Sequence, residues 1–385
     1  MELRRHPVRR RSTNQRQSGL SLVELLIALV LGLVLITGVL SVYLSSHKTY
    51  GVNTAVGQIQ ENGRAALNFI RVNTRMAGYM GCGATDSHFT NQLNTPASTM
   101  LPYNFGSVIT GFEANGTAPG DQYSLPAATP RAPRAGAAAA WSPALDPSMP
   151  SGSAAYVIPG SDIFAVSISQ RTITPSYVTG LGAGANSFTV AANNNSLVAG
   201  DLIVISNCVQ TAVREATAVK GLTIGTDTGT SAPGNASSLR PALVQNAQVT
   251  TASVVAYYVG LGADGAPALF EAFTDTSSAS GFSPQEIVPG VENMQVLYGV
   301  APAGSDAPTQ YLTAAEVSTQ SPALWSKVVS VRVALLLRSA TGAVHRPGVA
   351  QTYDLLGTGV VAPRDTRLRQ IFTATIALRN RLLRP

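Results

Sequence analysis

A long apolar run near the N-terminus constrains this chain more than any other feature. Over residues 25–44 the only strongly polar side chains are Thr37 and Ser41, which leaves about 20 residues to cross a bilayer as one helix. Glu24 lies at the start of this run, and a carboxylate at the centre of a spanning helix costs about 2.5–3.5 kcal/mol. Such an acid usually persists because a positive group meets it. A cut after Gly19 would create that group, a new amine close to Glu24.

The positive charge of the chain is concentrated before the apolar run. The formal net charge is +6 and the pI is near 9.5, values that suggest a nucleic-acid partner until the charges are located. Residues 1–19 hold five of the six net positive charges, with Glu2 set against Arg4, Arg5, Arg9, Arg10, Arg11 and Arg16. The remaining chain is nearly neutral, so we expect no specific nucleic-acid partner.

We interpret residues 1–19 as a basic leader that keeps the N-terminus cytoplasmic, because positive residues flanking a span stay inside. The apolar run has no Ala-x-Ala site after it and continues into helical sequence. A retained anchor is therefore expected in place of an ordinary cleaved secretory peptide.

The helical pattern continues beyond the span with one apolar face. Apolar or small residues recur at three- and four-residue spacing, which is typical of an amphipathic helix: Val52, Val56, Ile59, Gly63, Leu67 and Ile70. Glycines from Gly78 onward end the pattern. We predict one helix over about 20–77, roughly 85 Å long, with a transmembrane half at 20–44 and an amphipathic half at 45–80.

The remaining residues, 81–385, are expected to form a β-rich domain. Residues 95–160 are rich in Pro, Gly and Ala, which predicts a long loop or insertion outside the core. Short runs bounded by turn residues then predict strands: 163–168, 187–190, 201–206, 254–259 and 269–273, followed by longer runs at 328–337 and 371–378. The fold class is therefore α+β, a long N-terminal helix packed on a mainly antiparallel sheet.

Motifs for catalysis or metal binding are weak. Gly260-Leu-Gly-Ala-Asp-Gly265 matches a dinucleotide-binding glycine pattern, but a strand-like run follows it where that motif needs a helix, so a hairpin turn is expected. The histidines after the leader, His47, His88 and His345, are scattered. Asp227 lies in a loop-like cluster without EF-hand spacing. We expect no enzyme activity, no cofactor and no metal.

Two further groups of residues leave alternatives open. Cys82 and Cys208 both lie on the exported side, where a disulfide is favoured, although two buried free thiols remain the alternative. The C-terminal arginines are expected to form a solvated edge with salt bridges at strand ends, with an acidic partner or DNA as the alternative: Arg364, Arg367, Arg369, Arg379, Arg381 and Arg384.

The segment Gly19-Leu-Ser-Leu-Val-Glu24, with its basic leader and apolar run, resembles the class III signal of type IV prepilins and pseudopilins, although Leu20 stands where Phe is usual. Further stretches resemble the PilW family of type IV pilus minor pilins, from QENGRAALNFIRVNTRMAGYMGC at 60–82 through GDLIVISNC at 200–208 and VPGVENMQVLYGV at 288–300 to WSKVVSVRVALLLRS at 325–339 and FTATIALRNR at 372–381. The resemblance implies a type IV pilin-like fold and a structural role.

The resemblance also implies how the chain is processed and assembled. A prepilin peptidase would cut between Gly19 and Leu20 and the new N-terminus at Leu20 would be methylated, while Glu24 would pair with the amine of Leu20 on a neighbouring subunit. The implied partners are other minor pilins, the major pilin and a PilY-type tip protein, in a complex that primes the pilus. The protein would lie in the inner membrane before assembly and on the cell-surface pilus, near the tip, afterwards. Alternatives are a J-type pseudopilin of type II secretion and a tip adhesin or DNA-uptake pilin.

Overall fold

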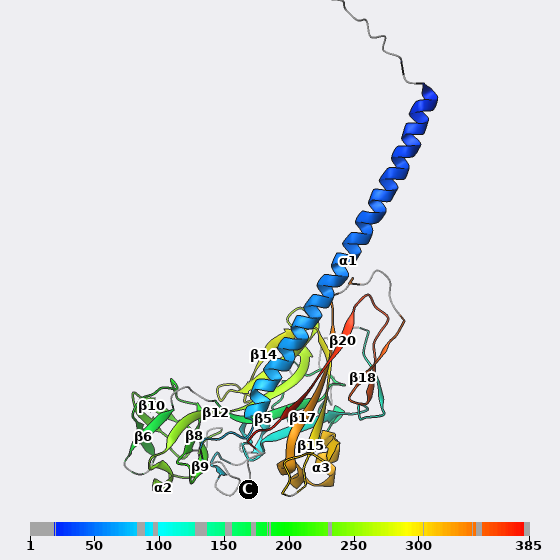
Figure 1. The fold of residues 1–385 in the computed structure, drawn as a ribbon. Helices are drawn as coiled ribbons and strands as arrows, with labels where there is room; N and C mark the ends of the chain where they lie inside the picture. The colour runs from blue at the N-terminus through cyan, green and yellow to red at the C-terminus, as the bar shows by residue number, and fades with distance from the viewer. Residues whose placement is uncertain are drawn as a thin grey trace, which may run out of the picture. The chain divides into compact units, whose positions relative to one another are not determined.

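A computed structural model describes residues 19, 21–82, 89–94, 99–127, 137–150, 156–170, 175–182, 184, 186–229, 233–302, 304–340, 342–343 and 349–380. These residues form two compact units, Met1–Asn53 and Thr54–Pro385. Helix α1 (Leu22–Met76) runs through the boundary between them (Figure 1). The expected helix over 20–77 is confirmed to within two residues, and the α+β, pilin-like fold class is confirmed as well.

The first unit is the apolar part of α1. The most apolar stretch of the helix has a mean hydropathy of 2.9, and none of it is buried against other parts of the chain. Leu22 and Leu35, for example, are at least 70% exposed. The Thr37 hydroxyl donates to the backbone carbonyls of Leu33 and Val34, so this polar group is satisfied within the helix. By length and composition the helix can cross a membrane.

The second unit contains the rest of α1 and three sheets. Within the described residues, thirteen strands form the largest sheet: β1 (Phe89–Asn91), β2 (Ile109–Ala114), β4 (Trp141–Ser142), β5 (Ile163–Gln170), β6 (Ser176–Leu181), β7 (Ser187–Val190), β8 (Leu202–Ser206), β9 (Thr211–Glu215), β10 (Ala218–Lys220), β11 (Thr223–Gly225), β12 (Gln248–Leu261), β13 (Pro267–Thr274) and β14 (Phe282–Pro289). β15 (Val291–Val300), β16 (Gln310–Leu312), β17 (Val328–Arg338) and β20 (Arg369–Ala377) form a four-stranded sheet, and β3 (Gln122–Ser124), β18 (Thr352–Leu355) and β19 (Thr358–Val361) form a three-stranded one. Short helices are α2 (Pro241–Val244) and α3 (Ala314–Gln320), with 3₁₀ turns η2 (Leu101–Tyr103), η3 (Ala137–Ala140) and η5 (Pro322–Lys327).

Most of the pairing is antiparallel, as the sequence predicted. In the described part of the chain the parallel pairs are β1 with β9 and β3 with β19. The glycine pattern at 260–265 lies at the β12–β13 hairpin, in which Leu261 pairs with Pro267. The hairpin turn predicted there is confirmed.

The prediction of a loop outside the core for residues 95–160 is wrong over much of its described part. β2 pairs with β5, and five of its six residues are buried. Trp141 is 3% exposed, and its indole N–H donates to the carbonyl of Ser161 at 2.9 Å. The composition misled because the core segments are short and lie between Pro- and Gly-rich stretches, which dominate any averaged count.

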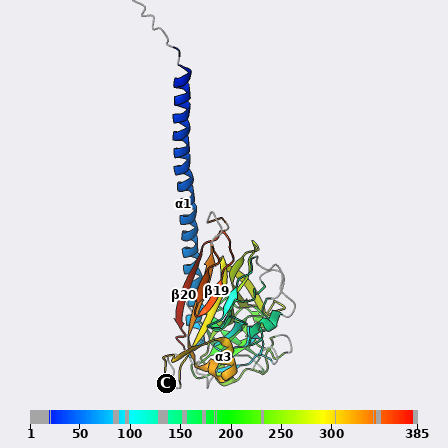
Figure 2. The ribbon, with the colours of Figure 1, turned by 90° about the vertical axis from the view of Figure 1, so that its right-hand side faces the viewer.

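The second half of α1 lies along the sheets (Figures 1 and 2). The buried helix residues are spaced by three or four, and most are small: Ala55, Ile59, Gly63, Ala66, Ile70 and Thr74. Ile59, Ala66 and Ile70 join a core built from β5, β12, β15 and β17. Gly63 lies directly against Phe372 on β20: a Cβ atom at Gly63 would be 2.5 Å from the phenyl ring.

Residues 176–249 form a lobe with its own hydrophobic core. The lobe comprises β6–β11, α2 and the start of β12, and its core includes Phe188, Ile203 and Leu243. α1 contributes no residue to this core in the described part of the chain.

We predict that Gly63→Ala lowers the free energy of unfolding by about 1–3 kcal/mol, the usual cost of overpacking a core. The matched control is Gly57→Ala, on the same helix, where a Cβ atom meets nothing within 4 Å. Because alanine favours helix over glycine, the control should be more stable by up to about 1 kcal/mol. Denaturant unfolding of the full chain in detergent, followed by tryptophan fluorescence, measures both. Equal effects of the two substitutions would contradict close packing at Gly63.

Candidate assembly site

The start of α1 carries the residues that the sequence singled out. The Ser21 hydroxyl accepts a hydrogen bond from the backbone N–H of Glu24 at 3.2 Å, as the side chain of a helix N-cap residue does. Glu24 therefore lies in the first turn of α1, where the positive end of the helix dipole favours an acid. Gly19 is exposed and non-helical. Leu20 and the leader residues 1–18 lie outside the described residues.

The Glu24 side chain is exposed and has no ion-pair partner among the described residues. Ile27, which lies beside it on the helix surface three residues on, is more than half exposed. A carboxylate on such an apolar surface is costly in lipid unless a cation meets it. Within the described chain this arrangement leaves the acid available to a group from another molecule.

Farther along the helix, a buried polar cluster attaches α1 to the large sheet. The side-chain amide of Asn73 donates to Glu271 Oε1 at 2.7 Å and to the Tyr257 hydroxyl at 2.8 Å. Tyr257 in turn donates to the same Glu271 oxygen at 2.5 Å. Tyr257 and Glu271 face each other across β12 and β13. Burial raises the pKa of Glu271, while the hydrogen bonds from Tyr257 and Asn73 oppose that rise.

Cys82 and Cys208 are joined in a disulfide, with their Cα atoms 4.7 Å apart. Cys82 follows the C-terminal end of α1, and Cys208 lies in the turn between β8 and β9. The bond closes a segment of 126 residues and ties the end of the helix to the lobe. Gly81 allows the chain after α1 to approach β8 closely, since a Cβ atom at Gly81 would be 2.6 Å from the Cβ of Ser206.

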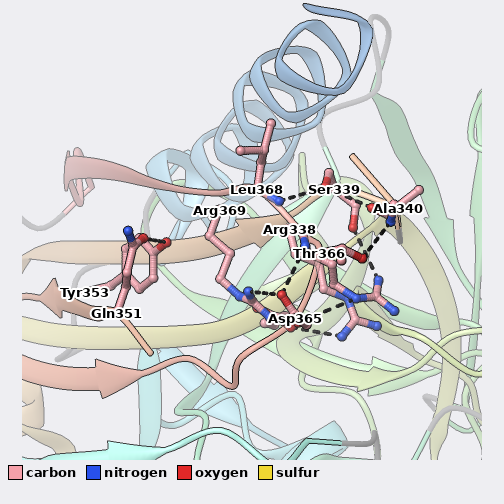
Figure 3. Close-up of polar contacts among 12 residues, drawn as sticks. Arg338, Ser339, Ala340, Gln351, Tyr353, Asp365, Thr366, Leu368 and Arg369 are labelled. Carbon is pink, nitrogen blue, oxygen red and sulfur yellow. Dashed lines mark hydrogen bonds and ion pairs between the residues drawn. The ribbon is translucent and has the colours of Figure 1, made fainter. Parts of the chain in front are cut away.

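An ion cluster joins the ends of three strands (Figure 3). Glu292 on β15 pairs with Arg338 on β17 at 2.9 Å and with Arg369 on β20 at 2.6 Å. Arg369 also pairs with Asp365 at 2.6 Å. Arg338 and Arg369 are directly opposite each other in the β17–β20 ladder, where like charges destabilise a sheet. Glu292 lies at a register shift in β15, and its carboxylate offsets the positive charges of both arginines.

The prediction for the C-terminal arginines was right about strand-end salt bridges and wrong about solvation at Arg369. Its side chain is 3% exposed and pairs with Glu292 and Asp365 within the ion cluster. Arg364 and Arg379 are exposed, as expected. Arg381 and Arg384 lie outside the described residues.

No group of three or more His, Cys, Asp or Glu side chains is placed to hold a metal ion in the described ranges. The Asp227 carboxylate accepts a hydrogen bond from the Thr217 hydroxyl at 3.4 Å, and its backbone N–H donates to the same hydroxyl. These contacts make Asp227 part of an ordered turn beside β11. His88 and His345 fall outside the described residues.

Two family models match parts of the chain. Residues 14–40 match the prokaryotic N-terminal methylation motif. Residues 256–380 match PilW, the Type IV Pilus-assembly protein W family. Together the matches support a type IV pilus-related pilin with an N-terminal prepilin motif. None of the curated proteins and none of the solved structures matches the chain.

The PilW match covers about a third of the chain, which we call the PilW segment (256–380). It begins within β12 and ends just after β20, so it contains the four-stranded sheet and the ion cluster. The stretches at 60–82 and 200–208, which also resemble this family, lie outside the match.

A buried acid pair connects the PilW segment to the strands before it. Asp162 accepts hydrogen bonds from the backbone N–H groups of Ala114 at 2.9 Å and Val296 at 2.8 Å. Glu113 is 5% exposed, and among the described residues its Oε2 has no hydrogen-bond partner. Desolvation, then the charge of Asp162, raises the pKa of Glu113 to about 10. Burial also raises the pKa of Asp162, but its two backbone donors oppose that, so Glu113 holds the proton at neutral pH.

Sequence reasoning missed the acid pair, Glu292 and the Asn73–Tyr257–Glu271 cluster. Each depends on strand register: Tyr257 meets Glu271, and Arg338 meets Arg369, only once the ladders are aligned. The available signal was an isolated acid within a strand-like run, as at Glu271 in LFEAF. An acid in such a run indicates a buried partner, because an unpaired buried charge is costly.

We predict that the buried, protonated Glu113 contributes stability that is lost as pH rises above about 4.5, and that Glu113→Gln removes this contribution to the pH dependence. The folded state keeps the Glu113 proton up to pH of about 10, whereas the unfolded chain loses it above its ordinary pKa of 4.5. One such group lowers the unfolding free energy by about 1.4 kcal/mol per pH unit in that window. Gln cannot ionise, so the variant should gain stability relative to wild type from pH 6 to pH 8.

Denaturant unfolding at several pH values measures this slope. Glu61→Gln, at an exposed position of α1, is the matched control and should keep the wild-type slope. An unchanged slope in Glu113→Gln would show that Glu113 is ionised in the folded protein.

Proposed function

We propose that the chain is a minor pilin of a type IV pilus, which joins other minor pilins in a tip complex that primes pilus assembly. The prepilin-type motif at 14–40 and the PilW segment support this assignment. The proposed sequence of events is cleavage between Gly19 and Leu20 by a prepilin peptidase, methylation of Leu20, and lateral assembly of the apolar helix with its neighbours.

The observation that carries the proposal is Glu24, which lies on an exposed apolar helix and has no ion-pair partner among the described residues. After cleavage, the nearest new cation on a neighbouring subunit would be the amine of Leu20. In hydrocarbon an ion pair is screened little, so a pair between Glu24 and this amine would fix the axial register of adjacent helices. The same acid would be a liability in a helix that only anchored the protein.

The size of the second unit supports a low copy number. This unit extends over Thr54–Pro385 and includes the disulfide-linked lobe. Globular domains of this size would crowd one another if they were repeated at every position of a closely packed pilus shaft. We therefore place the protein near the tip, with other minor pilins, the major pilin and a PilY-type tip protein as partners. Before assembly it would be held in the inner membrane.

We predict that Glu24→Ala is cleaved normally but assembles poorly. Mass spectrometry of the N-terminus should find a methylated Leu20 in wild type and in the variant. Surface pili should fall by about tenfold or more in the variant, since losing 1.4 kcal/mol per contact corresponds to a factor of ten. Glu61→Ala, at an exposed position of the same helix, is the control and should support normal piliation.

Three results would contradict the proposal. A mature N-terminus at Met1 in peptidase-positive cells would remove the processing step. Wild-type piliation in a strain lacking the protein would exclude a priming role. A secretion defect without loss of pili would favour a type II secretion pseudopilin.

A further inference from the structure

The long strand β12 changes partners along one edge and leaves a gap there. Its residues 248–251 pair with β8, and its residues 255–261 pair with β13. The opposite edge is occupied by β5 at 251–257. β8 and β13 therefore meet end to end beside β12, and residues 252–254 have no ladder partner between them.

A cavity of about 250 Å³ opens at this gap. Its lining comes from the turn before β8, the middle of β12 and the end of β13, and it includes Asp201, Thr251, Phe273 and Asp275. A water molecule occupies about 30 Å³ of liquid, so the space holds a ligand of several heavy atoms. A calcium ion, whose ligands lie at about 2.3–2.6 Å, would leave most of it empty.

The walls of the cavity are fixed by hydrogen bonds. The Thr276 hydroxyl donates to the carbonyl of Gly200 at 2.7 Å, which ties the end of β13 to the turn before β8. The Val254 N–H donates to the Thr274 hydroxyl at 2.8 Å, and that hydroxyl donates to the carbonyl of Pro102 at 2.8 Å. Neither wall depends on a ligand to hold its position.

Both carboxylates are held in place and keep one oxygen available. Asp201 accepts from the Val198 N–H at 2.8 Å through Oδ2. Asp275 accepts from the N–H and hydroxyl of Ser277 through Oδ1. In the part of the chain that the structure describes, the second oxygen of each has no hydrogen-bond partner, and neither does the Thr251 hydroxyl.

The composition of the lining selects a ligand rich in hydrogen-bond donors. It contains two acids and several hydroxyl or backbone groups but no Lys or Arg, so an anion is disfavoured. Sugar hydroxyls donate well to carboxylates in charge-assisted bonds. The apolar face of a sugar ring can in turn pack on Phe273, a partly exposed apolar side chain of the lining.

We propose that this cavity is a binding site for a neutral monosaccharide unit, such as the terminal sugar of a surface glycan. The site is independent of the pilin assembly role, because none of its lining residues lies on α1. If both are right, the protein adds glycan contact to filament priming.

Saturation-transfer NMR on the full-length protein in detergent micelles tests the site, with glucose, galactose, mannose and N-acetylglucosamine as probes. At least one sugar should receive saturation. Asp275→Asn should weaken its binding by about tenfold or more, because it removes a charged acceptor. Thr251→Val should weaken it severalfold, and this hydroxyl has no hydrogen-bond partner to lose among the described residues. Asp264→Asn, in the exposed β12–β13 turn, is the matched control and should bind as wild type.

Three outcomes would overturn the proposal. The first is that none of the four sugars is saturated. The second is that Asp275→Asn and Thr251→Val bind like wild type. The third is that ethylammonium or calcium binds at the cavity and the sugars do not. Pilus assembly need not change in any variant of the cavity, so this test is separate from that of Glu24.

Discussion

The close approach of the second half of α1 to the sheets is the contact on which the rest of the second unit depends. The helix can lie this near only because its inner stripe is made of small residues, with Gly63 against the Phe372 ring and Ala66 fully buried. A larger side chain at either position would move the helix outward. Ile59 and Ile70 then enter a core shared by the thirteen-stranded and the four-stranded sheets. On the outer face, Phe69 and Val72 stay exposed, so one short helix segment supplies both an inner seam and an outer apolar surface.

Buried polar groups determine how the strands around that seam are aligned. The Asn73–Tyr257–Glu271 cluster, the Glu113–Asp162 pair and the Glu292 ion cluster each join residues that are far apart in the sequence. Such groups contribute little net stability, because desolvation offsets most of the attraction between them. Misalignment would be costly, however, since each would leave a buried charge or polar atom without a partner. We infer that their main effect is to favour one register over its alternatives.

The N-terminal half of this architecture could be predicted from the sequence, because its signals are local. An apolar run of spanning length and a three- and four-residue repeat define α1 without reference to the rest of the chain. The β12–β13 hairpin and most of the long strands also have local turn and alternation signals. In contrast, β2 was missed because six residues of strand lie within a Pro- and Gly-rich stretch. Glu292 and Asp162 were missed because their roles exist only after distant strands pair.

The partner change in β12 coincides with the start of the family match. The PilW segment begins at residue 256, one residue after the pairing of β12 with β13 begins at Val255. Before that point the same strand pairs with β8 and β6, which belong to the lobe. The lobe has a separate core, and the Cys82–Cys208 disulfide ties it to the end of α1. The lobe core and the core that packs on α1 are linked by β12 and by the disulfide, but within the described residues α1 contributes only to the second. Changes within the lobe would therefore leave the buried surface of α1 intact. The cavity at the join takes its lining from both parts of the unit, with Asp201 from the lobe and Asp275 from the PilW segment.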